Sequence, residues 1–317
     1  MKITFQKHYP FFSPVWLRNA IAASAVIVIA LSVFFVVKPS SRKGGIAFVA
    51  NVNGNWDLFI VNGDGKDLTQ LTNTPIDERT PALSPNGEQV AYSTSDGAIW
   101  VMTLGNKSAN RLQLSGERNG YPAWLSDGSG IVYTSYKVTP PTEDADFFVY
   151  SFQEQNSKIF LTQTGPQDYP ALSPSGDRLA YISSLATLIP GFGNTITQQL
   201  WVASLLDGKP AQLLMGSAIE SQPAWSPDGE WIAFASDRKG SPDIWIVKPD
   251  GQGLEQLTNS SAFESSPCWS PSGEEIAFVS NESGRMQLTV INVNSRKSRA
   301  LSPFSSNPVE IKDPSWR

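Results

Sequence analysis

Short hydrophobic runs alternate with polar turns along nearly the whole chain after residue 44. Three kinds of run follow one another in a fixed order, as at residues 223–225 (Pro-Ala-Trp), 232–234 (Ile-Ala-Phe) and 243–247 (Asp-Ile-Trp-Ile-Val). Between the first two lies a Ser-Pro-Asp-Gly turn at residues 226–229. Runs this short, rich in β-branched and aromatic residues and bounded by Gly, Pro, Asn and Asp, predict β-strands rather than helices.

This pattern repeats six times, and each repeat ends in a fourth short run such as Gln-Leu-Thr at residues 256–258. The prolines that open the first run are Pro81, Pro122, Pro170, Pro223, Pro267 and Pro314. Four strands in roughly 40 to 50 residues, repeated in series, are typical of a β-propeller. We therefore predict an all-β, six-bladed propeller built of four-stranded antiparallel blades.

The first blade lacks an opening Pro-x-Trp run, because its second strand at residues 46–48 follows almost directly on the basic residue Lys43. The run Pro-Ser-Trp at residues 314–316 would supply the missing strand. We therefore expect the C-terminal strand to join the first blade and close the ring, which removes an open sheet edge.

The N-terminal part of the chain has a different pattern, since residues 20–37 form an uninterrupted apolar run without a charge. As a helix this run would cover about 27 Å, close to the roughly 30 Å core of a bilayer. No small-x-small cleavage site follows it, which favours a retained signal anchor over a cleaved signal peptide. We predict a short basic segment (1–19), a transmembrane helix (20–37), a linker (38–44) and the propeller (45–317).

A single-pass anchor would place the propeller outside the cytoplasm, in the periplasm, although the flanking charges do not fix the orientation. The chain has 24 Lys and Arg against 29 Asp and Glu, and the formal net charge is −5. Residues 1–43 contain no Asp or Glu, so the propeller is the acidic part. Clustered basic side chains provide most of the affinity for nucleic acid, so we expect no nucleic-acid partner.

The reactive side chains narrow the function further, because the only histidine is His8 and the only cysteine is Cys268. The propeller therefore has no residues for a Ser-His-Asp site, a His-ligated zinc or a Cys-x-x-Cys pair. We expect no catalytic residue, cofactor or metal. The prediction is a non-enzymatic module, and the alternative is a cation-dependent lyase or hydrolase that uses carboxylates in the central channel.

The repeat Pro-x-Trp-Ser-Pro-Asp-Gly, Ile-Ala-Phe, Ile-Trp-Val and Leu-Thr resembles that of the TolB-like family of six-bladed propellers, and residues 223–229 are a full copy. The resemblance covers residues 45–317 and leaves out the N-terminal α/β domain that TolB carries. It implies a monomeric propeller that binds a protein, a peptide or an envelope glycan. We expect this contact on the face that carries the connections between the second and third strands of each blade. The resemblance assigns no site residue, because the motif residues build the blades.

Candidate binding residues lie where two blades depart from the repeat. The connections between second and third strands are long in the third blade (residues 136–145) and in the fourth (residues 184–198). The first contains Glu143 and Asp144, and the second contains Ile189 and Phe192. Long loops on a rigid scaffold commonly carry binding sites. The alternative is that the apolar residues fold over their own blade.

Acidic residues also recur before the Pro-x-Trp strands. They are Glu78, Glu117, Asp168, Glu220, Glu264 and Asp313. We expect Glu78, Glu220 and Glu264 in particular to line the mouth of the channel, where converging carboxylates would attract a cation, a basic side chain or a partner peptide. The alternative is that they are solvated loop charges.

The aromatic residues of the repeat are expected to be structural. We predict that Trp124, Trp225, Trp269 and Trp316 pack between blades. Cys268 takes a position where most repeats have Ala, so it is expected to be a small buried residue. The Asp-Gly pairs lack the alternating oxygen ligands of a calcium loop and are expected to be ordinary turns.

Overall fold

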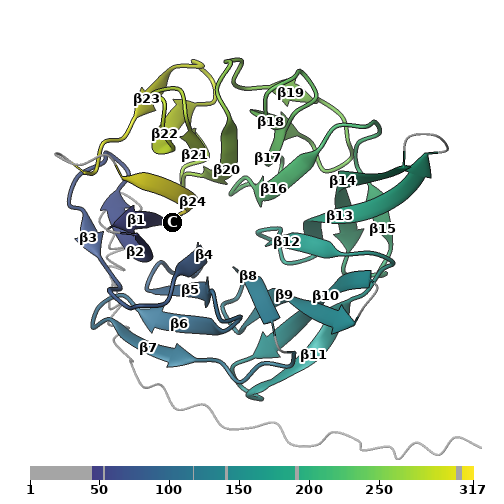
Figure 1. Cartoon of the computed structure of the whole chain (residues 1–317), viewed down its shortest axis with the longest axis horizontal. Helices are drawn as coiled ribbons and strands as arrows, with labels where there is room; N and C mark the ends of the chain where they lie inside the picture. Colours follow the sequence, from purple (N-terminus) through teal and green to yellow (C-terminus); the bar gives the residue numbers. More distant parts are fainter. Residues whose placement is uncertain (1–44, 53, 117, 140–141, 190–192, 305–308) are drawn as a thin grey trace, which may run out of the picture. The chain divides into compact units, whose positions relative to one another are not determined.

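A computed structural model describes residues 45–52, 54–116, 118–139, 142–189, 193–304 and 309–317. These residues form 24 strands in six four-stranded antiparallel sheets, arranged as blades around a central axis (Figure 1). The predicted six-bladed propeller is therefore confirmed. The basic segment, the transmembrane helix at 20–37 and the linker lie outside the described residues. In the part that is described, no helix has the length and apolar character needed to span a bilayer.

Each blade after the first uses four consecutive strands, and the first of them lies innermost (Figure 1). The second blade contains β4 (Glu78–Leu83), β5 (Gln89–Thr94), β6 (Ile99–Thr103) and β7 (Ser108–Arg111). The third contains β8 (Arg118–Trp124), β9 (Gly130–Thr139), β10 (Thr142–Ser151) and β11 (Asn156–Leu161). The fourth contains β12 (Gln167–Leu172), β13 (Arg178–Ile189), β14 (Gly193–Ser204) and β15 (Pro210–Gln212). The fifth contains β16 (Glu220–Trp225), β17 (Ile232–Ser236), β18 (Asp243–Val247) and β19 (Glu255–Gln256). The sixth contains β20 (Glu264–Trp269), β21 (Glu275–Ser280), β22 (Gln287–Asn292) and β23 (Ser298–Ala300).

The first blade is completed by the C-terminal strand, as predicted. It contains β24 (Glu310–Trp316), β1 (Gly45–Val52), β2 (Asn55–Asn62) and β3 (Thr69–Gln70), in that order. Trp316 lies opposite Ile46, and the backbone N–H of Arg317 donates to the carbonyl oxygen of Gly45 at 3.1 Å. β1 therefore has a neighbour on each side, and the ring is closed.

The hydrophobic core lies between the blades. Trp225 packs against Leu200 of the fourth blade and Phe234 of its own blade, and its indole N–H donates to the carbonyl oxygen of Ala171 at 2.9 Å. The same bond to the preceding blade joins Trp124 to Ala82 at 2.8 Å and Trp269 to Ala224 at 3.1 Å. The prediction that the tryptophans of the repeat pack between blades is confirmed.

The two faces of the ring differ in their connections. We call the side with the Ser-Pro-x-Gly-like turns (84–87, 125–128, 173–176, 226–229 and 270–273) the turn face, and the opposite side the loop face. In the turn of the fifth blade, Ser226 Oγ donates to Asp228 at 2.5 Å, and Gly229 has a φ of +73°. The carboxylate therefore closes the turn, as expected for an ordinary Asp-Gly turn.

Two hairpins extend beyond their blades on the loop face. The sequence predicted loops over residues 136–145 and 184–198, and this prediction was wrong. β9 stays paired with β10 as far as Thr139 and Thr142, and β13 stays paired with β14 as far as Ile189 and Gly193. Both segments contain β-branched residues at short intervals, so the ladder continues where a loop was expected.

Candidate functional site

One buried position in each innermost strand lies three residues before the proline of the repeat. It holds Glu78, Asn119, Gln167, Glu220, Glu264 and Ile311, all of them buried. The side chains of Glu78, Glu220 and Glu264 are 2%, 2% and 4% exposed. The structure therefore places these three glutamates within the ring of blades and not at the mouth of the channel, where the sequence predicted them.

Glu78 connects the first two blades. The hydroxyl of Thr72 donates to one of its carboxylate oxygens at 2.7 Å, and the hydroxyl of Thr74 donates to the other at 2.8 Å. Thr72 in turn accepts the backbone N–H of Leu58 at 2.8 Å. Burial raises the pKa of Glu78 to about 7 against the lowering effect of both hydroxyls, and the charge of Asp57 raises it further.

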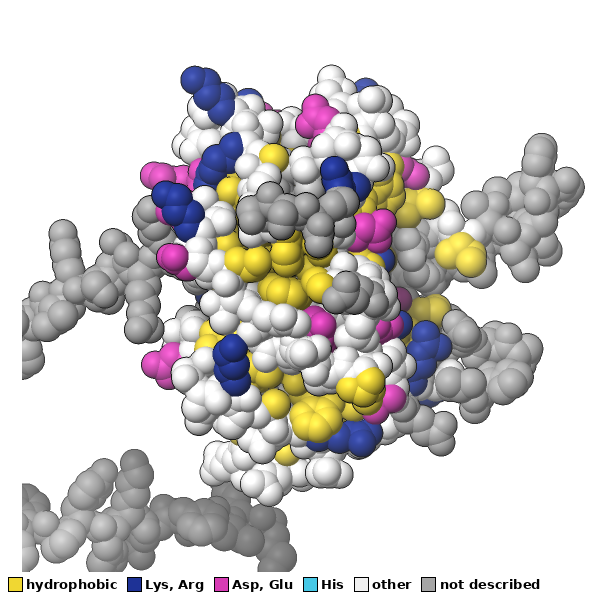
Figure 2. Space-filling view, turned by 60° about the vertical axis from the view of Figure 1, so that its left-hand side comes forward, with side chains coloured by type: hydrophobic (Ala, Val, Ile, Leu, Met, Phe, Trp, Pro, Cys, Tyr) yellow, Lys and Arg dark blue, Asp and Glu magenta, His cyan; other side chains and the backbone are white. Residues whose placement is uncertain are grey.

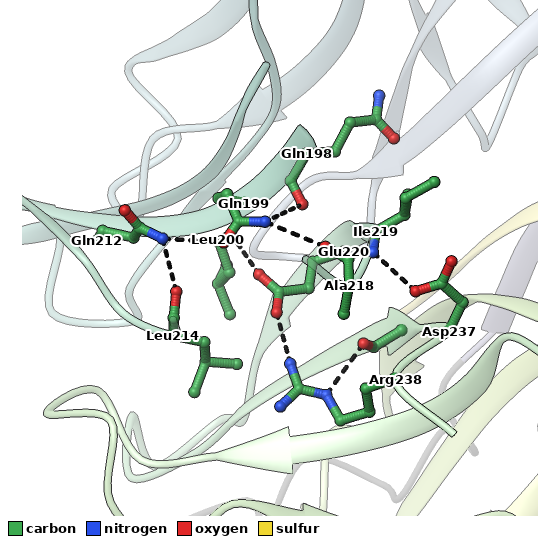
Figure 3. Close-up of polar contacts among 11 residues, drawn as sticks. Gln198, Gln199, Leu200, Gln212, Leu214, Ala218, Ile219, Glu220, Asp237 and Arg238 are labelled. Atoms are coloured by element: carbon green, nitrogen blue, oxygen red, sulfur yellow. Dashed lines mark hydrogen bonds and ion pairs between the residues drawn. The ribbon is translucent and has the colours of Figure 1, made fainter. Parts of the chain in front are cut away.

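Glu220 connects the fourth and fifth blades (Figure 3). One of its carboxylate oxygens accepts the backbone N–H of Leu200 at 2.7 Å, and the other accepts the guanidinium of Arg238. The side chain of Arg238 is only 16% exposed, and its guanidinium carbon lies 5.1 Å from the ring centre of Trp245. Burial raises the pKa of Glu220 to about 7, although the bond from Leu200 and the charge of Arg238 lower it.

Glu264 has a related arrangement between the fifth and sixth blades. The hydroxyl of Ser260 donates to its carboxylate at 3.1 Å, and the hydroxyl of the neighbouring Thr258 accepts the backbone N–H of Ile244 at 2.9 Å. Burial is the main cause that raises the pKa of Glu264. All three glutamates therefore hold blades together through hydrogen bonds.

The other acidic residues of the predicted set have different surroundings. Glu117 lies outside the described residues. Asp168 accepts a hydrogen bond from the phenol of Tyr136 at 2.5 Å. Of the five that the structure describes, Asp313 is the one that lines the neck of the channel.

The candidate binding residues of the two hairpins are placed as follows. Glu143 and Asp144 belong to β10, Ile189 ends β13, and Phe192 lies outside the described residues. The carboxylate of Asp144 accepts the backbone N–H of Ala145 at 3.0 Å. A binding role for these four residues stays a prediction.

The position directly before each repeat proline lines a small cavity on the axis of the ring. This position holds Thr80, Tyr121, Tyr169, Gln222, Ser266 and Asp313, which together line a cavity of about 150 Å³ that we call the neck. All six have a left-handed φ between 46° and 56°, and the pairing of each innermost strand shifts register there. A bulge redirects a side chain, so each blade presents one side chain to the axis.

The neck has a polar part and an aromatic part. Gln222 Nε2 donates to Ser266 Oγ at 2.7 Å, and Ser266 Oγ donates to Asp313 at 3.3 Å. The rings of Tyr121 and Tyr169 have centres 4.3 Å apart. Sequence analysis missed this ring because its residue type varies from blade to blade. The feature of the sequence that could have revealed the ring is that all six residues directly precede a repeat proline. The proline restricts the backbone of the residue before it and disfavours the α region there.

On the turn face the channel widens into a cavity of about 1330 Å³, which we call the funnel. Its wall includes Pro85, Pro174, Pro227 and Pro271 of the turns and parts of the four repeat tryptophans. Cys268 also lines the funnel, and it is half-buried and packs against the hydrophobic core between the sixth and first blades. Burial raises the pKa of its thiol to about 12. Residues of five separate turns line this cavity, so no single sequence segment indicates it.

On the side that carries the first blade, hydrophobic side chains lie among Lys, Arg, Asp and Glu side chains of both signs (Figure 2). Within the described residues, no group of three His, Cys, Asp or Glu side chains lies close enough together to hold a metal ion. The fold and the site thus define a six-bladed β-propeller with a funnel-shaped axial channel.

Comparison with known proteins identifies the family. The family model of the TolB beta propeller domain matches residues 15–189 and 186–316, and the chain belongs to this family. A Protein TolB homolog of Chlorobium luteolum is 29% identical over 212 residues, which are 66% of this chain and 45% of that protein. The Tol-Pal system protein TolB of Syntrophus aciditrophicus is 41% identical over 76 residues, 24% of this chain and 14% of that protein.

Among solved structures, TolB from Acinetobacter baumannii superposes with a TM-score of 0.72 at 20% sequence identity, covering 88% of this chain and 67% of that chain. At this identity the likeness shows the fold. The chain spans less than half the length of the two curated relatives described above.

Proposed function

We propose that this chain is a membrane-anchored, extracytoplasmic propeller that binds a protein of the cell envelope and catalyses no reaction. The observation that carries the proposal is the funnel. Its volume of about 1330 Å³ exceeds the roughly 300 to 1,000 Å³ typical of small-molecule pockets, so it suits a segment of a protein. The apolar run at residues 20–37 supports the anchor.

The position of the funnel moves the proposed contact from the loop face to the turn face. Its wall combines prolines and tryptophan edges with polar residues such as Asn86, Glu88 and Ser126 at the turns. An apolar centre with a polar rim is the usual composition of a protein interface. The name of the Syntrophus relative, which assigns that protein to the Tol-Pal system, agrees with a protein partner.

The alternative of a cation-dependent lyase or hydrolase requires carboxylates that converge in the channel. The neck contains one carboxylate, that of Asp313. Glu78, Glu220 and Glu264 are buried and use their carboxylates in hydrogen bonds inside the ring. The arrangement of the described residues therefore gives this alternative no support.

Crosslinking from the two faces tests the proposal. Glu88 is exposed and lines the funnel, whereas Glu282 is exposed on the loop face between β21 and β22. Glu88→Cys and Glu282→Cys, each made in the full chain with Cys268→Ser, would carry the same thiol-linked photocrosslinker in native membranes. Mass spectrometry would identify the attached proteins.

We expect one specific envelope protein to be captured from Glu88→Cys and not from Glu282→Cys. Capture from Glu282→Cys alone would show that the loop face binds the partner and would contradict the funnel as the site. No specific product from either variant would contradict the binding function itself.

A further inference from the structure

The neck holds a carboxylate, that of Asp313, for which no ion pair is found among the described residues. Asp313 accepts hydrogen bonds from the hydroxyl of Ser266, at 3.3 Å, and from the backbone N–H of Thr80. Burial raises its pKa, and the charges of Lys312 and Arg79 lower it, but both of these basic side chains have closer partners. Lys312 Nζ lies 4.2 Å from the ring centre of Trp56, and Arg79 pairs with Asp77 at 4.0 Å.

The first and fourth blades lie across the ring from each other (Figure 1), so the tyrosine pair lies across the neck from Asp313. Burial is the main cause that raises the pKa of Tyr121 and of Tyr169, and the negative charges of Asp168 and Asp313 raise both pKa values further. The carboxylate of Asp313 is therefore close enough to act on both phenols. Aromatic faces and a carboxylate around one small cavity are the groups that attract an organic cation.

The size of the neck limits the ligand. A cavity of about 150 Å³ has room for one alkylammonium or guanidinium group in place of several water molecules. A hard divalent cation would prefer six or more oxygen ligands with several carboxylates among them, and the neck offers one. A neutral ligand would leave Asp313 without a counter-charge.

The neck opens into the funnel, because Pro122, Pro170 and Pro223 line both cavities. We propose that the neck binds the cationic end of one Lys or Arg side chain, which a partner protein inserts through the funnel. Asp313 is its counter-ion, the oxygens of Ser266 and Gln222 accept further hydrogen bonds, and the tyrosine pair contacts the alkyl stem and the cation. This inference rests on the proposed function.

A titration of the full chain in detergent tests the neck without knowledge of the partner. The chain would carry carbon-13 in its eight tyrosines, of which Tyr121 and Tyr169 report on the neck. Tyr92, Tyr150 and Tyr181 are internal controls, whereas the phenol of Tyr136 interacts with Tyr121 and is not used as one. The probe is n-butylammonium chloride, and n-butanol is its neutral counterpart. The variants are Asp313→Asn and Glu310→Gln, which removes an exposed charge from the same strand.

We expect butylammonium to shift the signals of the two neck tyrosines, and butanol to leave them unchanged. Asp313→Asn should weaken the apparent affinity by at least about tenfold, since a hydrogen bond to a charged group is lost. Glu310→Gln should bind as the native chain does. Thr80→Lys, which brings an ammonium group of its own into the neck, should abolish the titration.

Equal shifts with butanol, or an affinity that Asp313→Asn leaves unchanged, would overturn the inference. Shifts that depend on Asp313 and arise with calcium chloride but not with butylammonium would overturn it in favour of a metal site. A partner captured from Glu88→Cys as efficiently with Asp313→Asn as without it would refute the inserted side chain while the proposed function stands.

Discussion

The buried carboxylate of Glu78 should make the propeller less stable as the pH rises. The side chain is 2% exposed, and its two partners are neutral hydroxyls, those of Thr72 and Thr74. Glutamine has almost the same shape and keeps one oxygen acceptor, but it carries no charge. Glu78→Gln therefore removes the cost of burying the ionised form, at the expense of part of one hydrogen bond.

The magnitude follows from the two pKa values. Burial raises the pKa of Glu78 from the ordinary 4.5 to about 7 in the folded state. The stability that protonation provides is fully present below the lower of these values, and it is lost as the pH rises through the higher one. This gap is worth about 3 kcal/mol of unfolding free energy in total, and about 2 to 3 kcal/mol of it falls between pH 5 and pH 8.

Urea unfolding of the full chain at pH 5 and pH 8, followed by tryptophan fluorescence and by circular dichroism, measures this effect. The difference in unfolding free energy between Glu78→Gln and the native chain isolates the one residue from all other titrating groups. The unfolding free energy of Glu78→Gln, relative to that of the native chain, should be higher at pH 8 than at pH 5 by about 2 to 3 kcal/mol. The control Glu88→Gln, at an exposed turn, should show no such shift. A difference for Glu78→Gln that is the same at both pH values would refute the reasoning.

Two further substitutions test the blades by urea unfolding. Arg238→Met should cost about 3 to 5 kcal/mol, because it leaves Glu220 buried without its ion pair. The half-exposed Arg296 is its control, and Arg296→Met should cost less than about 1 kcal/mol. Gly229→Ala should cost about 1 to 2 kcal/mol, because its φ of +73° disfavours a Cβ, although that Cβ would meet only Pro174 Cδ, at an ordinary 3.7 Å. Gly105→Ala, without a left-handed φ, should be nearly neutral. Equal losses within either pair would contradict these assignments.

The architecture could be predicted because the same four-strand pattern occurs six times in the sequence. Each turn glycine and each Pro-x-Trp run marks the same point of a blade, and Pro314 to Trp316 supplied the one strand that was missing. The hairpins could not be predicted, since Pro140 and Pro141 in one of them are as typical of a loop as of a turn between long strands.

The sequence could not show which acidic residues line the channel, and the reason is a different one. A shift of two positions in an innermost strand separates Ile311, which is buried between blades, from Asp313, which lines the channel. The bulge that causes this difference inserts a residue locally, so simple alternation along the strand fails there. The two positions differ in sequence only in their distance from the repeat proline, which is three residues for Ile311 and one for Asp313. A search for acidic residues at any distance before the proline therefore does not separate buried positions from channel positions.

The pairing of β24 with β1 also sets the order in which the chain can be assembled. Ile46 pairs with Val61 of β2 on one side but has no partner on the other until Trp316 has been synthesised. β1 to β3 therefore remain an incomplete sheet while the later blades form from consecutive strands. Contacts this distant in sequence form slowly, because a very long loop must close first. The first blade is therefore the last to be completed, and the edge of β1 that faces the channel stays unpaired until the C-terminal strand has been made.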